Sequence, residues 1–83
     1  MSMDVIQLPK NEEDAYLSVV DGYDVEITGK KGKMVVQKTA DDRQYEVWDS
    51  KNDKTSKPFK YPIEAYNLAC KMVGGFLDWK ILE

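Results

Sequence analysis

Residues 23–38 read YDVEITGKKGKMVVQK, and this stretch decides the fold. Over residues 23–28, apolar and polar side chains alternate strictly, which is the pattern of a strand with one buried face. Gly29-Lys30-Lys31-Gly32 is a short loop bounded by glycines, and residues 33–38 are again rich in β-formers. Two such runs joined by a short glycine-containing loop predict a β-hairpin, with Tyr23, Val25 and Ile27 on its buried face.

The pattern continues after a turn at residues 39–43. Residues 44–49 alternate again, with Tyr45 and Val47 on one face and Trp48 on the other, which predicts a third strand. A polar turn follows at residues 52–56. Pro62 then stands where proline is best tolerated, at the start of a helix. A helix is expected over residues 62–73, because its apolar residues form one stripe and Gly74-Gly75 ends it.

The two ends of the chain carry weaker patterns. Residues 3–8 predict a short strand or extended arm. A helix is expected at 12–20, with Asn11 as its N-cap and Gly22 as its C-terminal stop. Residues 76–82 predict a strand with Leu77, Trp79 and Ile81 on one side, and a short helix is the alternative.

These elements predict one small α+β domain over residues 1–83. Its expected core is an antiparallel three-stranded meander (about 23–28, 33–38 and 44–49) packed on the helix at 62–73. The residues expected to join sheet and helix are Tyr45, Val47, Phe59, Ile63, Tyr66, Cys70 and Val73.

The composition argues against an enzyme. The chain has no histidine, which removes the commonest general base and the commonest neutral metal ligand. Asp49-Ser50-Lys51-Asn52-Asp53-Lys54 begins like a calcium loop, but it has lysine at its third and sixth positions, and Lys60 at the twelfth. Neither a metal nor another cofactor is therefore expected.

Cys70 is the single cysteine, so no internal disulfide is possible. A secreted domain of this size usually carries several cysteines, so a reducing compartment, the cytoplasm, is expected. The sequence shows neither a signal-peptide pattern nor an apolar run long enough to span a membrane.

Charge is unevenly distributed along the chain. Residues 1–28 hold one lysine against seven acids, whereas residues 29–60 hold eight lysines and Arg43 against five acids. Such segregation concerns partners more than fold. Gly29-Lys30-Lys31-Gly32 also matches the GxxG loop that clamps nucleic-acid backbones in KH domains, although the preceding residues predict a strand where a KH domain has a helix.

Residues 44–73 resemble the last strand and helix of small domains in which a three-stranded sheet packs on one helix. Gln44-Tyr45-Glu46-Val47, Phe59 and Glu64-Ala65 carry the likeness. The arm-binding domains of tyrosine recombinases and the plant ethylene-response DNA-binding domains are similar. The resemblance implies a sheet that contacts DNA, but this chain has only one arginine, Arg43.

Two binding functions follow as hypotheses. The first is a protein-binding adaptor or modulator of phage or mobile-element origin. Its expected contact residues are Asp14, Asp21, Asp24, Glu26 and Trp48, since an exposed tryptophan can anchor a partner. The alternative is a nucleic-acid-binding domain. Its expected residues are Lys30, Lys31, Lys33, Trp48, Lys51, Lys54 and Lys57. The sequence leaves open whether the two lysine loops share one end of the sheet and whether the N-terminal helix or the tail covers Trp48.

Overall fold

A computed structural model describes residues 10–82, which form two helices and a five-stranded sheet. In chain order the elements are α1 (Lys10–Val20), β1 (Asp24–Gly29), β2 (Gly32–Lys38), β3 (Tyr45–Asp49), β4 (Lys54–Thr55), α2 (Pro62–Met72) and β5 (Phe76–Leu82). The α+β class is thereby confirmed. The arm predicted at residues 3–8 lies outside the described residues.

The strands lie in the order β4-β3-β2-β1-β5, and every neighbouring pair is antiparallel. Val36 stands opposite Val25 on one side and Val47 on the other, so these three side chains share a face. The predicted meander of three strands is present as β1, β2 and β3. The sheet nevertheless has two strands more than that meander, because β5 adds to β1 and β4 adds to β3.

The two outer strands differ in how their sequences reveal them. β5 forms at residues 76–82, where apolar and polar side chains alternate. The strand prediction is therefore confirmed, and the helical alternative is wrong. β4 lies in the segment predicted to be a turn. Its short pairing with β3 continues at Ser56, whose N–H donates to the Val47 carbonyl (2.8 Å) and whose hydroxyl accepts from the Val47 N–H (2.9 Å).

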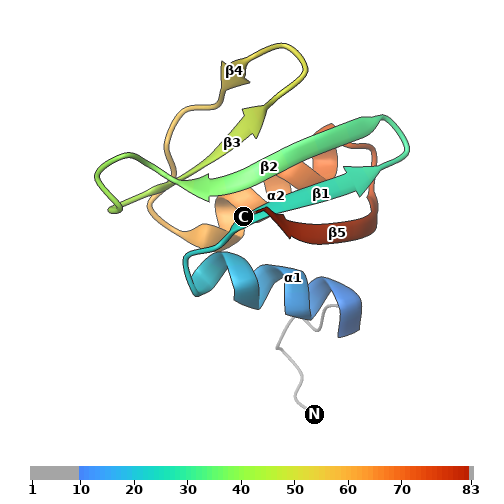
Figure 1. Ribbon diagram of the computed structural model, residues 1–83, viewed down its shortest axis with the longest axis horizontal. Helices are drawn as coiled ribbons and strands as arrows, with labels where there is room; N and C mark the ends of the chain where they lie inside the picture. The colour runs from blue at the N-terminus through green and yellow to red at the C-terminus, as the bar shows by residue number, and fades with distance from the viewer. Residues whose placement is uncertain (1–9, 83) are drawn as a thin grey trace.

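Both helices cover the same face of the sheet. In Figure 1, α2 passes behind β1 and β2, and α1 lies along the β5 side. Apolar residues from α1, α2 and the first three strands meet in one core. The fully buried members of that core are Ala15, Val19, Val25, Ile27, Val36, Val47, Ala65, Tyr66, Ala69 and Val73. Neither of the two described helices lies on the opposite face of the sheet.

Glycines end both helices in the same way. Gly22 has a φ of +101°, and its N–H donates to the Val19 carbonyl (3.0 Å). The N–H of the next residue, Tyr23, donates to the Ser18 carbonyl (3.1 Å). Gly74, with a φ of +79°, repeats this arrangement after α2. A positive φ suits glycine, which is why it stands at such C-terminal caps.

Three sequence-based details are wrong. Asn11 is not an N-cap, because α1 begins at Lys10, the residue directly after Pro9, and Asn11 falls in its first turn. Tyr23 precedes β1 and is exposed, although it fits the alternation. Leu77 is 69% exposed, because the pairing of β5 with β1 shifts between Thr28 and Gly29 and takes Leu77 out of the regular register.

Tyr66 is the largest fully buried side chain of the core, and it joins α2 to α1. It is 1% exposed, its ring packs edge-on against Tyr16 at 5.6 Å, and its hydroxyl donates to the Glu12 carboxylate at 3.1 Å. We expect Tyr66→Ala to cost roughly 2 to 4 kcal/mol of unfolding free energy, since it leaves a large cavity. Asn67→Ala, one residue along and exposed, is the control. Urea titration of both variants measures the difference, and equal stabilities would show that α2 does not pack through Tyr66.

Candidate binding surfaces

The open face of the sheet carries a mixed row of side chains. Strand register places Lys80, Glu26, Val35, Trp48 and Thr55 side by side across all five strands. Val35 is only 2% exposed although neither α1 nor α2 covers it. Side chains of its own face must therefore shield it, and Trp48 and Glu26 are its direct neighbours in register. This face is thus a polar surface with one small apolar centre.

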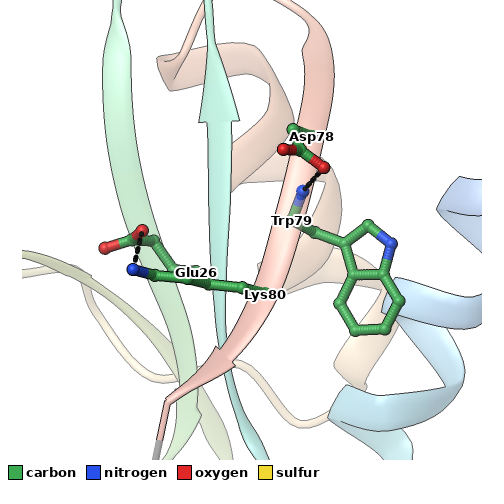
Figure 2. Close-up of polar contacts among 4 residues, drawn as sticks. All are labelled: Glu26, Asp78, Trp79 and Lys80. Carbon is green, nitrogen blue, oxygen red and sulfur yellow. Dashed lines mark hydrogen bonds and ion pairs between the residues drawn. The ribbon is translucent and has the colours of Figure 1, made fainter.

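Charged groups on β1 and β5 are partly paired with each other. The Lys80 ammonium lies 3.8 Å from the Glu26 carboxylate, and the Asp78 carboxylate accepts the backbone N–H of Trp79 at 2.8 Å. Figure 2 shows the Trp79 indole pointing toward α1, whereas Glu26 and Lys80 point to the other side of the sheet. The Lys80 side chain is 64% exposed but that of Glu26 is only 13% exposed, so an exposed lysine covers a largely buried carboxylate.

Trp48 lies on the open face, opposite to Tyr45 and Val47. Neither α1 nor β5 covers it, because α1 packs against β1, β5 and α2, and β5 lies at the far edge of the sheet. The indole is half-buried, and its Nε1–H donates to Asp53 at 3.3 Å. The tryptophan therefore stands between the open face and the β3–β4 turn.

The acidic residues predicted to bind a protein do not form one patch. Asp24 and Glu26 share the open face with Trp48, separated from it by β2. Asp14 is exposed on α1, in the helical layer, and Asp21 follows the end of that helix. The structure thus brings three of the five predicted residues to one face and leaves two elsewhere.

Most of the lysines predicted to bind nucleic acid lie together. The β1–β2 turn and the β3–β4 turn are at the same end of the sheet, because antiparallel pairing sets Val35 against Trp48 and so brings the start of β2 beside the end of β3. In Figure 1 both turns lie on the side away from the β2–β3 turn. We call this region the basic turn end. Its lysines are Lys30, Lys31, Lys33, Lys51 and Lys54.

Lys57 belongs elsewhere. It follows β4, and its ammonium lies 5.7 Å from the centre of the Phe59 ring. Phe59 pairs with Tyr45 at the start of β3, which is the opposite end of that strand. Lys38 and Lys60 lie at that end too, over the rings of Tyr45 and Tyr61.

A groove of about 340 Å³ separates the two turns of the basic turn end. One wall is residues 31–34 and the other is residues 49–52. Lys31, Lys33 and Lys51 supply positive charge to it, and Ser50 and Asn52 supply neutral polar groups. Gly32 belongs to the GxxG match, whereas Met34, Ser50 and Asn52 are uncharged and follow no motif, so sequence reasoning did not identify these three as lining a site.

The β3–β4 turn is held by its own acidic residue. The Asp49 carboxylate accepts the backbone N–H groups of Lys51 (3.1 Å) and Asn52 (3.2 Å), and the Asn52 side-chain amide (2.8 Å). The hydrogen bond from the Asn52 side chain is the main reason why the pKa of Asp49 lies below its ordinary value. These hydrogen bonds to Asp49 therefore stabilise the conformation of the β3–β4 turn.

The β1–β2 turn is fastened to the end of α2. The Lys31 N–H donates to the Val73 carbonyl at 2.7 Å. Gly29 lies so close to the end of α2 that a methyl group on it would overlap the carbonyl oxygens of Val73 and Gly75. Since both contacts are made by backbone atoms, the other wall of the groove is fixed by the helix as well as by the sheet.

Metal-binding side chains do not gather in the described part of the chain. Among residues 10–82, no three His, Cys, Asp or Glu side chains lie together in a way that could hold a metal ion. Cys70 is half-buried on α2, and burial raises the pKa of its thiol. Neither described helix, α1 or α2, is long and apolar enough to cross a membrane.

In comparisons with known proteins, no family model, curated protein or solved structure matches the chain. The resemblance to recombinase arm-binding and ethylene-response domains therefore stays a prediction.

Gly29 offers a test of how the basic turn end is held. We expect Gly29→Ala to cost at least about 1 kcal/mol of stability, because the added methyl forces the α2 end and the β1–β2 turn apart. Lys30→Ala, in the exposed turn next to it, is the control and should change stability by less than about 0.5 kcal/mol. Thermal unfolding of both variants measures this. A Gly29→Ala protein as stable as wild type would contradict the close approach.

Proposed function

We propose that this chain is a non-catalytic binding domain that holds a nucleic-acid backbone at its basic turn end. The observation that carries the proposal is the placement of the two lysine-bearing turns at one end of the sheet, with a groove between them. A phosphate backbone requires positive charges along one continuous path, and lysines on separate ends could not supply it.

Local charge favours an anionic partner although the whole chain is acidic. The basic turn end has five lysines against Asp49 and Asp53, a net charge of +3, whereas the chain has a net charge of -3. Both aspartates accept hydrogen bonds from their own surroundings, Asp49 from its turn and Asp53 from the Trp48 indole. At moderate salt, charges farther than about 10 Å away are screened, so the nearby lysines dominate.

The residue chemistry supports binding without catalysis. Histidine is absent from the sequence, and the single thiol is half-buried with a raised pKa, which lowers its thiolate fraction and thus its reactivity. The lone cysteine also supports our proposal that the protein resides in the reducing cytoplasm.

Charge reversal tests the nucleic-acid proposal. We expect wild-type protein to shift labelled DNA or RNA at about 50 mM salt, with affinity falling steeply as salt rises. Changing Lys30, Lys31 and Lys33 to Glu should abolish the shift, because repulsion replaces three attractions. Gel-shift titration against salt measures both effects.

A matched control separates position from net charge. Lys38, Lys57 and Lys60 changed to Glu alter the total charge equally but lie at the other end of the molecule. This variant should keep most of the affinity once its folding has been checked by circular dichroism. Equal losses in both triple variants, or no binding by wild type, would contradict the proposal.

Protein binding through the open face is a second candidate function. The favouring observation is that Asp24, Glu26 and Trp48 share a sheet face that no described element covers. An adaptor or modulator of phage or mobile-element origin would use Trp48 as its apolar anchor and the two acids to select a basic partner.

Affinity capture from a host lysate tests this second function. We expect wild-type protein to retain a specific partner that a variant carrying Asp24→Lys and Glu26→Lys does not, since these changes reverse the charge of the face. A variant carrying Asp14→Lys and Asp21→Lys, which lie off that face, is the control. Equal retention by wild type, test variant and control would exclude the open face as the contact.

A further inference from the structure

We infer that the basic turn end binds single-stranded nucleic acid in preference to duplex, with a phosphate in the groove and an unpaired base stacked on Trp48. This inference rests on the proposed function and adds the class of nucleic acid that the same site takes. It follows from the size of the groove, the position of the tryptophan and the charges that surround both.

The groove is built for one strand. Its volume of about 340 Å³ suits a group of the size of one nucleotide, and three lysines from two opposite walls point to a single phosphodiester path between them. Both walls are fixed by hydrogen bonds, from Lys31 to the end of α2 and from the β3–β4 turn to Asp49.

Trp48 lies on the open face and directly precedes Asp49, the first residue of one groove wall. Its register partner on β2 is Val35, and Lys33, a lysine of the groove wall, lies two residues before Val35 on the same face. The hydrogen bond from its Nε1 to Asp53 ties the ring edge to the β3–β4 turn. A base attached to a phosphate in the groove can therefore reach the indole. Stacking of this kind needs an unpaired base and depends little on sequence.

The charges farther along the open face disfavour a duplex. Asp24 and Glu46 lie on that face beyond Trp48, whereas Glu26 lies in the row of Trp48 and is paired with Lys80. A double helix laid across the sheet would bring its phosphates onto these carboxylates, where like charges repel. A single strand that follows the groove and stops at Trp48 avoids them.

Fluorescence anisotropy with four labelled probes tests the inference: oligo-dT, oligo-U, a DNA duplex of equal length and heparin. We expect wild type to bind the two single strands at least about tenfold more tightly than duplex. Trp48→Ala should weaken single-strand binding by about 5- to 100-fold and leave heparin, which has no bases, within about twofold. Trp48→Phe should stay within about threefold of wild type.

Two further variants keep the result interpretable. Trp48→Leu retains an apolar side chain without an aromatic ring, so it should bind single strands as poorly as Trp48→Ala while remaining folded. In a Trp79→Phe background Trp48 is the only tryptophan, and its emission should be quenched by oligo-dT but not by heparin.

The outcomes separate the two levels of the proposal. Duplex bound as tightly as single strands, or equal binding by Trp48→Leu and wild type, would overturn the stacking inference and leave backbone binding standing. Failure of wild type to bind any probe, including heparin, would overturn the proposed function and the inference with it.

Discussion

The close packing of Gly29 against the end of α2 is the constraint on which the rest of the structure depends. A side chain at this position would collide with two backbone carbonyl oxygens, so the strand can approach the helix only through glycine. The Lys31 N–H then satisfies the Val73 carbonyl, one of the acceptors that a helix end leaves free. Gly74 and Gly75, which follow α2, lead directly into β5, and β5 pairs with β1. One contact thus sets the helix, the hairpin and the edge strand at fixed positions, and places the lysines of the β1–β2 turn at one wall of the groove.

Local patterns predicted most of the elements and the three-stranded meander, but not the pairing of β4 and β5 at its edges. Val25 and Ile27 alternate with polar residues, and Tyr66 lies on an apolar helical stripe. The buried side of each of these segments could therefore be predicted from its own sequence. The strand Lys54–Thr55 could not be predicted in this way, because two polar residues show no alternation of apolar and polar side chains. It is identified only by its pairing with β3. Leu77 fits the alternation of β5 yet lies exposed, since the register shift at Gly29 depends on the partner strand.

For the candidate site too, the sequence shows which residues carry charge but not which of them lie close together in the fold. The lysines of residues 29–60 were evident from the charge distribution, but their relation to each other required the register of β2 on β3. That register brings Lys31 and Lys33 beside Lys51 and takes Lys57 to the other end of the sheet. It also places Trp48 beside the groove, because the tryptophan is the register partner of Val35. Charge that is segregated along the sequence becomes a usable surface only through this pairing.

The account places binding at one end of the sheet, and an NMR titration tests that placement most directly. Isotope-labelled protein titrated with a short single-stranded oligonucleotide reports every backbone amide and the two indole N–H groups. The account predicts that the largest shift changes fall on residues 30–33 and 49–54 and on the Trp48 indole, while the β2–β3 turn and the Trp79 indole remain unchanged. Largest changes around residues 39–44 or along α1 would contradict it.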